Sequence, residues 1–144
     1  MKIDTKYFGE IEIGDEKIIH FDNGILGFED YKDYTILYDI EADGKSFFSW
    51  LQSVDEKMLS FPIVNPLKVD ENYNPTVNDE MLKPIGSYSD EDIAIFLLAT
   101  IPQDVKEASV NMRAPLIINA STRKGIQLIL DGQEYEIRHK LIKQ

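Results

Sequence analysis

Residues 126–138 read IQLILDGQEYEIR, and this stretch sets the expected fold of the chain. Two runs with alternating apolar positions flank Asp131 and Gly132, the dipeptide preferred in a two-residue type I′ hairpin turn. Pairing Leu130 with Gln133 would gather four apolar side chains on one face: Ile126, Leu128, Tyr135 and Ile137. The opposite face would carry Gln127, Ile129, Glu134 and Glu136. The stretch therefore predicts an antiparallel hairpin with one face toward a core and one toward water.

The N-terminal part of the chain shows the same pattern of strands and turns. An alternating run at 8–13, turn formers at 14–16 and an apolar run at 17–21 predict an antiparallel strand pair. The next block, residues 23–29, places apolar residues around and between two glycines, and it predicts a tight, buried loop.

Four further runs are predicted to be strands. Residues 34–38 and 47–53 have the composition of strands that alternate between two faces. Residues 59–66 are apolar but contain two prolines, which favours a sheet edge or a bulge. Residues 93–101 are apolar on both faces, and we expect them to form the most buried strand.

One short helical turn is expected at residues 78–82, before Pro84 and Gly86. Sustained helical periodicity and internal repeats are absent from the sequence. Short strands separated by turns are typical of all-β proteins. We therefore expect an all-β fold, an antiparallel β-barrel-like single domain over residues 1–144 with one or two short helical turns, although a sandwich has the same pattern.

Composition places limits on function. A chain of 144 residues with 43% hydrophobic content can bury a core as one domain. It has no cysteine, which excludes disulfides, thiolate zinc sites and cysteine nucleophiles and favours a cytoplasmic location. The longest apolar run is far shorter than the roughly 18 to 20 residues that span a bilayer, and the N-terminus lacks an apolar signal core. We expect neither a membrane anchor nor an export signal.

The charge is strongly negative and unevenly distributed. Fifteen basic and 26 acidic residues give a net charge of −11, a field that repels nucleic acid phosphates. Residues 1–69 carry 14 acids and 7 bases, residues 70–107 carry 9 and 2, and residues 108–144 carry 3 and 6. The middle segment is therefore a candidate surface for a basic protein partner, with an attraction that salt would weaken.

Motifs for metal or cofactor chemistry are absent from the sequence. His20 and His139 lack metal-ligand spacing and are predicted to be structural. The acidic run at 90–92 lacks the pattern of a calcium loop, and residues 123–125 are too short for a phosphate loop. No cofactor is expected. A pair of carboxylates acting as the acid and base of a hydrolase remains possible, because their separation depends on the tertiary structure.

A few single residues have two interpretations each. Arg113 lies in an apolar stretch, so it requires either a structural carboxylate partner or a role in binding. Trp50 is expected to be a core anchor, with an interface role as the alternative. Asn65 and Asn119 are expected to stabilise turns through side-chain hydrogen bonds.

Seven short blocks follow one another between residues 8 and 139. They read FGEI at 8–11, NGILGFE at 23–29, WLQSVD at 50–55, IVNP at 63–66, NMRAPLIIN at 111–119, RKGIQ at 123–127 and IRH at 137–139. In this order, across nearly the whole chain, they resemble the family of the bacterial flagellar assembly factor FliW. The block residues expected to be structural are Gly24, Gly27, Phe28, Trp50, Asn65, Pro66, Asn111, Arg113 and Pro115.

The resemblance implies a β-barrel-like fold and a non-enzymatic switch between two protein partners. Members of this family bind CsrA, an RNA-binding regulator that silences the flagellin message, and they also bind flagellin. When unassembled flagellin accumulates, it occupies the factor and CsrA is released to stop translation. The resemblance also implies that CsrA is antagonised from a surface away from its RNA contacts, by an allosteric or electrostatic effect.

Charge, and not a family motif, selects the candidate CsrA-facing residues. They are the acids of the predicted loops: Asp70, Glu71, Asp79, Glu80, Asp90, Glu91 and Asp92. For flagellin we expect an amphipathic helix lying in an apolar groove. The candidate groove residues are Met81, Leu82 and Tyr88, for which burial in the core is the alternative.

Two other functions remain open at this stage. A general chaperone for exported subunits would bind flagellin but not CsrA. A small hydrolase that uses two carboxylates would need a deep pocket and an acid with a strongly raised pKa. We expect a monomer with no direct contact to nucleic acid or membrane, because the sequence has neither a coiled-coil pattern nor a basic patch.

Overall fold

The computed structural model describes residues 1–38 and 47–141. Its strands are β1 (Lys2–Thr5), β2 (Gly9–Glu12), β3 (Ile19–Phe21), β4 (Asp33–Tyr38), β5 (Ser49–Ser53), β6 (Ser60–Val64), β7 (Ile93–Thr100), β8 (Ser109–Val110), β9 (Leu116–Asn119), β10 (Lys124–Gln127) and β11 (His139–Lys140). Its helical elements are short: η1 (Asp15–Lys17), η2 (Pro66–Lys68), α1 (Asp79–Leu82), η3 (Lys83–Ile85), η4 (Asp90–Asp92) and η5 (Val105–Glu107). The predicted all-β class is confirmed, and the helical turn expected at residues 78–82 is α1. Within the described ranges, no helix is long and apolar enough to cross a membrane.

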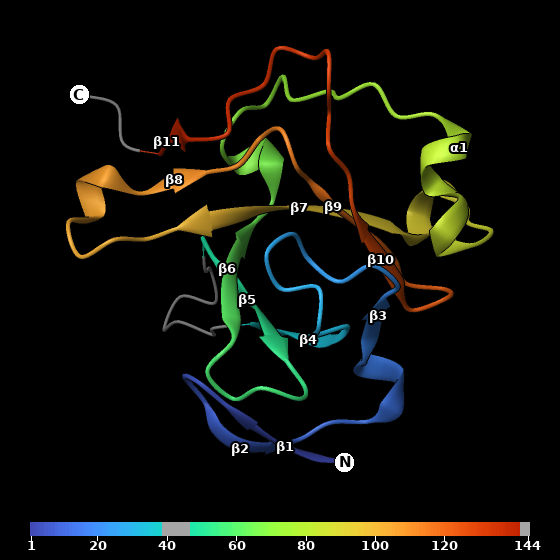
Figure 1. Ribbon diagram of the computed structural model, residues 1–144, viewed down its shortest axis with the longest axis vertical. Coiled ribbons are helices and arrows are strands. Elements are labelled where there is room, and N and C mark those ends of the chain that lie inside the picture. Colours follow the sequence, from blue (N-terminus) through green and yellow to red (C-terminus); the bar gives the residue numbers. More distant parts are fainter. Residues whose placement is uncertain (39–46, 142–144) are drawn as a thin grey trace.

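Seven strands close into a barrel, in the order β7, β6, β5, β4, β3, β10, β9 and back to β7 (Figure 1). Six of these pairings are antiparallel, and the β3–β10 pairing is parallel. The predicted antiparallel barrel is therefore correct except at one pair. The exception has a geometric cause, because strands that alternate in direction can close a ring only when their number is even.

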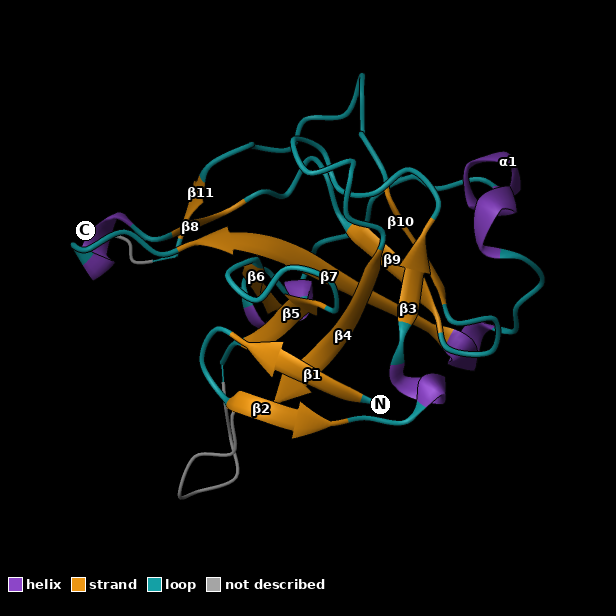
Figure 2. Cartoon of the chain, turned by 60° about the horizontal axis from the view of Figure 1, so that its bottom comes forward, coloured by secondary structure: helices purple, strands orange, loops and turns teal. Residues whose placement is uncertain are grey.

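The N-terminal strand pairing differs from the prediction. β2 pairs with β1, whereas β3 pairs with β4 and β10, and η1 carries the chain between the two sheets (Figure 2). β1 is the nearer partner along the chain, and closing the shorter loop costs less conformational entropy. The Tyr7 ring packs on Trp50 with centroids 4.6 Å apart, and the Lys6 N–H donates to Gln52 Oε1 at 3.1 Å. Trp50 is thus half-buried and joins the β1–β2 hairpin to the barrel.

The prediction of a C-terminal hairpin is wrong, although the chain does turn at the expected place. The Gln133 N–H donates to Leu130 O at 3.3 Å. Gly132 has a φ of +79°, but Asp131 does not have the positive φ that a type I′ turn also requires. The local dipeptide therefore determines that the chain reverses, but not which strands pair.

The partners of the residues around this turn come from elsewhere in the chain. β10 ends at Gln127, and the N–H groups of Leu128 and Leu130 donate to Pro115 O and Arg113 O. On the other side of the turn, Glu136 O accepts from the Met112 N–H. The segment before β9 thus takes the hydrogen bonds that a hairpin would have used. Ile137, predicted to face the core, is exposed.

β6 is a central strand of the barrel wall, paired with β5 on one side and β7 on the other, and not the edge strand that its prolines predicted. The Ser53 N–H donates to Leu59 O, so hydrogen bonds to β5 fall on alternate residues of β6 from Leu59 onward. The nitrogen of Pro62 therefore points away from β5, toward β7. Pairing with β7 begins only at Ile63, so the missing N–H of Pro62 removes no ladder bond.

The most buried strand is β9, not β7 as predicted. All four residues of β9 are buried, whereas β7 buries only Leu97 and Ala99 of its eight residues. The other large apolar residues of β7 pack against the core clusters but are only partly buried: Ile93, Ile95, Phe96 and Leu98. β9 has apolar clusters on both faces, with Ile118 in one and Ile117 in another.

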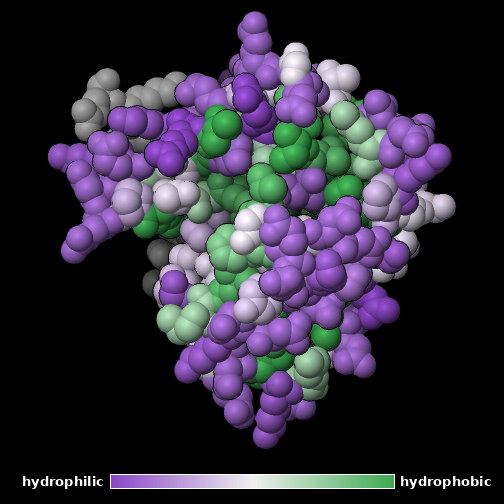
Figure 3. All heavy atoms as spheres, in the orientation of Figure 1, coloured by the Kyte–Doolittle hydropathy of each residue, from purple (hydrophilic) through white to green (hydrophobic). Residues whose placement is uncertain are grey.

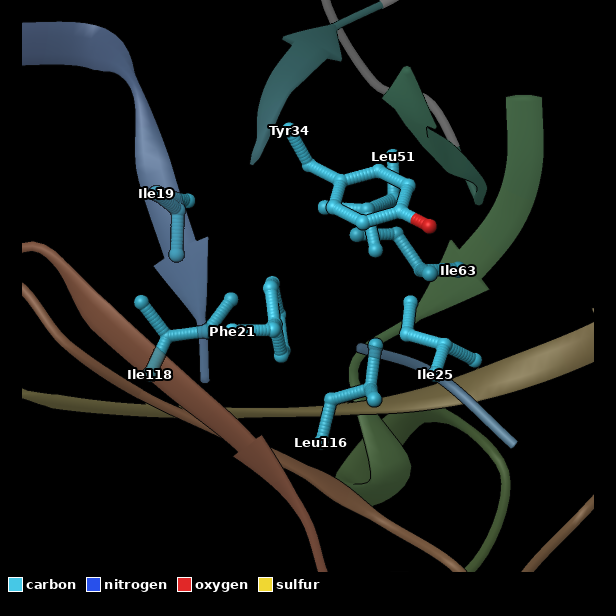
Figure 4. Packing of buried hydrophobic residues seen from close by; sticks show 8 residues of the cluster. All are labelled: Ile19, Phe21, Ile25, Tyr34, Leu51, Ile63, Leu116 and Ile118. Carbon is cyan, nitrogen blue, oxygen red and sulfur yellow. The ribbon is translucent and has the colours of Figure 1, made fainter. Parts of the chain in front are cut away.

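The barrel interior is filled by a cluster of eight buried residues (Figure 4): Ile19, Phe21, Ile25, Tyr34, Leu51, Ile63, Leu116 and Ile118. Phe21 and Tyr34 meet edge to face with ring centroids 5.6 Å apart. Burial raises the pKa of the Tyr34 hydroxyl to about 12. Another buried apolar cluster lies on the outer side of β9. It contains Leu82, Ile85, Ile117, Leu128 and Leu130. This outer cluster fixes α1 and η3 on the barrel.

Candidate protein-binding surfaces

α1 and η4 bring five of the seven predicted acidic residues to one side of the molecule. We call this set the acidic edge: Asp79, Glu80, Asp90, Glu91 and Asp92. Tyr88 lies between the two elements, and its hydroxyl donates to Asp79 Oδ1 at 3.4 Å. Desolvation raises the pKa of Tyr88, and the charges of Asp79 and Asp90 raise it further. Asp79 of α1 and Asp90 of η4 are therefore both close enough to Tyr88 for their charges to act on its hydroxyl.

Local hydrogen bonds explain why these acids stand where they do. The Asn78 side chain caps α1 by accepting from the Met81 N–H at 3.0 Å. Asp92 closes a capping box with Ser89, whose N–H and Oγ donate to Asp92 Oδ2 at 3.1 and 2.9 Å. Glu80 forms an exposed ion pair with Lys83 at 3.1 Å. In contrast, the side chains of Asp90 and Glu91 have no hydrogen bond or ion pair within residues 1–38 and 47–141.

Asn119 at the end of β9 holds the chain between α1 and η4. It is fully buried, and its Nδ2 donates to Ile85 O at 2.9 Å and to Ser87 O at 3.1 Å. Its Oδ1 accepts from the Ser121 N–H at 3.0 Å, as expected for a residue that stabilises a turn. Thr122 Oγ1 also donates to Ile85 O, at 2.6 Å. The acidic edge is thus attached to the barrel wall.

The other two predicted acids lie apart from the acidic edge. Asp70 accepts from the Asn72 N–H at 2.9 Å in the turn that follows η2, and Glu71 is exposed beside it. Figure 1 shows η2 and α1 at opposite ends of a segment that crosses the top of the view. The seven acids therefore form two groups and not one surface.

The candidate flagellin contacts belong to the outer cluster. Leu82 is buried in it, while Met81 and Tyr88 are half-buried against it. This is the burial foreseen as the alternative to a groove. Their part in binding stays a prediction, for which Met81 and Tyr88 present side-chain surface and Leu82 does not.

The block residues near β9 have structural contacts. Arg113 Nε donates to Tyr135 O at 3.2 Å, and no carboxylate of a described residue forms an ion pair with Arg113. Of its two interpretations, the structural ion pair is therefore wrong, and the role in binding stays a prediction. A partly buried carbonyl takes the place of the carboxylate, because it offers the acceptor that a guanidinium requires. Asn111 Oδ1 accepts from the N–H groups of Arg113 and Ala114 at 3.0 and 3.1 Å. Asn65 caps η2 by accepting from the Leu67 N–H at 2.9 Å.

A second surface, not predicted, is a cleft of about 280 Å³ between the loop after β3 on one side and β10 with Ile129 beyond it on the other, with Pro84 of η3 completing the lining. We call it the loop cleft. Its apolar lining is Leu26, Pro84, Ile126 and Ile129, and its acidic lining is Asp22 and Glu29. The signals were present in the sequence: a leucine between two glycines, and an isoleucine on the predicted solvent face of the hairpin. The face shown in Figure 3 is mostly hydrophilic, with hydrophobic surface gathered in its upper centre.

The titratable groups near the loop cleft are bound to their neighbours. His20 lies 2.7 Å from Asp33 through Nδ1 and 3.3 Å from Asp22 through Nε2. The backbone N–H of Gly27 lowers the pKa of the Glu29 carboxyl, the opposite of the raised pKa of a general acid. Across the described ranges, no group of three or more His, Asp or Glu side chains is placed to hold a metal ion. The cleft gives the hydrolase alternative no support.

The fold and surfaces define a class, a small acidic β-barrel protein with a charged edge and an apolar cleft. The sequence profile described as FliW protein matches residues 2–141. The chain therefore belongs to the FliW family, and the resemblance seen in the seven blocks is confirmed.

Relatives and a solved structure agree with this assignment. The flagellar assembly factor FliW of Lachnospira eligens is 45% identical over 142 residues, which cover 98% of this chain and 94% of the relative. The factor of the same name from Lachnoclostridium phytofermentans is 44% identical over 144 residues, which cover 100% and 92%. A crystal structure of the flagellar assembly factor FliW superimposes with a TM-score of 0.89 at 30% identity, covering 100% of this chain and 99% of that one.

Proposed function

We propose that this protein is a cytoplasmic, non-enzymatic regulator that binds CsrA, prevents it from acting on the flagellin message, and is itself sequestered by unassembled flagellin. Membership of the FliW family supports the flagellar role, since the relatives are named flagellar assembly factors. The partners come from the family resemblance. The circuit is negative feedback, in which surplus flagellin releases CsrA and stops its own synthesis.

The acidic edge is the observation that carries the CsrA part of the proposal. Asp90 and Glu91 are exposed carboxylates on a chain of net charge −11. A basic RNA-binding protein is attracted to such a surface, and the bound complex repels RNA phosphates without covering the RNA site. The same field keeps the protein itself off nucleic acid.

Removing charge from the acidic edge tests this part. The double variant Asp90→Asn and Glu91→Gln removes two carboxylates that make no side-chain bond among the described residues, so the fold is retained. We expect CsrA affinity to fall about two- to tenfold at low salt, with a smaller dependence on salt. Affinity is measured by titration calorimetry at two salt concentrations.

The matched control removes two charges from a different surface. Glu10 and Glu12 are exposed on β2, in the β1–β2 hairpin at the bottom of Figure 1. The variant Glu10→Gln and Glu12→Gln should bind CsrA nearly as the wild type does. Equal losses in both variants would mean that only net charge matters, and an unchanged salt slope in the first would remove the acidic edge from the proposal.

Co-purification from cells with and without flagellin distinguishes the proposed circuit from its alternatives. The proposal predicts that more CsrA is recovered with the protein when flagellin is absent. A general chaperone would bring down flagellin from the strain that makes it, and CsrA from neither strain. A hydrolase would bring down neither.

A further inference from the structure

We propose that the loop cleft receives an amphipathic segment of a partner protein, with apolar side chains against Leu26 and Ile129 and a lysine or arginine beside Glu29. The proposal rests on the proposed function, because flagellin is the partner with which it is tested. The argument starts from the exposure of Leu26 and Ile129, which are 69% and 43% exposed on opposite walls of the cleft.

The loop that carries Leu26 is held in place by its own contacts. The Leu26 N–H donates to Gln127 Oε1 at 2.8 Å, which joins the loop to β10. Ile25 is 1% exposed and anchors the loop in the barrel interior, and the Phe28 N–H returns to Ile25 O at 2.7 Å. Because Ile25 is fixed inward, Leu26 is turned outward. Its exposure is therefore built into the fold, and a binding partner needs no reorganisation of the loop.

The lining of the cleft indicates the chemistry of its occupant. Four apolar residues line it, and its charged lining residues are both acids. Asp22 already has a cationic neighbour, Lys124 Nζ at 4.0 Å, and it lies 3.3 Å from His20 Nε2. Glu29 accepts from the Gly27 N–H at 3.0 Å; the charge of Lys32 reaches the Glu29 carboxyl, but the Lys32 ammonium donates to the backbone oxygen of Glu29 and forms no ion pair with the carboxylate. A cation on the partner would therefore pair with Glu29.

Charge also determines which class of occupant is favoured. A second copy of this chain would bring another net charge of −11 to the same place, so self-association is opposed. A volume of about 280 Å³ is below the range of about 300 to 1,000 Å³ that encloses a drug-sized ligand, yet it accommodates a few side chains. An amphipathic segment of another protein fits both the charge and the volume of the cleft, because it inserts a few apolar side chains and keeps its backbone outside.

The test places a charge on each wall in turn and measures binding of purified monomeric flagellin by titration calorimetry. Leu26→Asp and Ile129→Asp should each weaken binding about ten- to hundredfold, the effect of losing one buried aliphatic contact. Glu29→Gln should weaken it about two- to fivefold, because glutamine still accepts from the Gly27 N–H but carries no charge. The control is Leu67→Asp, the same change at a leucine of η2 that is 58% exposed and does not line the cleft.

Each result of these binding and light-scattering measurements either supports or overturns the proposed role of the loop cleft. Weaker binding by both cleft variants, with Leu67→Asp unchanged and circular dichroism spectra unchanged, supports the proposal. Wild-type affinity in both cleft variants overturns it while leaving the proposed function intact, whereas a wild-type protein that binds no flagellin overturns both. A dimer in light scattering that Leu26→Asp dissociates would assign the cleft to a second copy and overturn the partner named here.

Discussion

Two glycine turns, one between the barrel strands β3 and β4 and one after the last barrel strand, β10, differ in the contacts that hold them. The loop of residues 22–29 contains Gly24 at a φ of +66°, and the turn of residues 130–133 contains Gly132 at +79°. A Cβ on Gly24 would lie 2.7 Å from Glu29 Cα, whereas a Cβ on Gly132 would meet no atom within 4 Å. Both turns need glycine for local backbone reasons, but only the first is also packed against other backbone.

The difference shows how much a turn can impose on the rest of a fold. The packed loop fixes Ile25 in the core and Leu26 at the surface. The open turn reverses the chain but leaves the flanking residues free to pair with the segment before β9. The packed loop thus determines where its neighbouring side chains lie, whereas the pairing of the residues beside the open turn is determined by the rest of the chain.

The largest expected effect comes from breaking the packed turn. Gly24→Ala places a methyl group against the Glu29 backbone at a positive φ, so both strain and overlap oppose the folded state. We expect a loss of about 2 to 5 kcal/mol in the free energy of unfolding. Urea denaturation measures it, and a loss below about 1 kcal/mol would contradict the close approach.

Gly132→Ala makes the same change in the open turn, and it is the control for the first. Space is available for the methyl group, so only the positive φ is penalised. The expected loss is about 1 to 2 kcal/mol, clearly smaller than that of Gly24→Ala. Equal losses in the two variants would show that backbone strain alone accounts for both.

The smallest expected effect concerns the hydrogen bond inside the packed loop. The pKa of Glu29 is lowered in the folded state from its ordinary value of 4.5, so its stabilising contribution is present above pH 4.5 and lost as the pH falls through the folded-state value. Glu29→Gln should therefore be slightly less stable than the wild type at about pH 7, with the gap narrowing toward about pH 3. Urea denaturation at the two pH values checks it, and a gap that does not depend on pH would exclude the titration of Glu29 as its cause.

The sequence predicted much of the architecture and less of the site. The strands at residues 34–38 and 47–53 and the helical turn before Pro84 lie where expected, because alternation and capping are local properties. The acids of α1 and η4 could be named as candidates, but their separation from Asp70 depends on the path of a long loop. The sequence carried a signal for the exposure of Leu26 and of Ile129 separately, but their meeting in one cleft could not be predicted, since they are about a hundred residues apart.

The sequence by itself determined the all-β class, the positions of the turns and the negative charge, because each follows from residues close together or from composition. Only the tertiary structure decided which strands are neighbours, why one pair is parallel, and which apolar side chains stay exposed. Strand pairing is chosen by the burial of apolar surface over the whole chain and by closure of a ring of seven strands. The local preference of Asp131 and Gly132 for a hairpin is therefore overridden, because the residues before the turn pair with the segment before β9 instead.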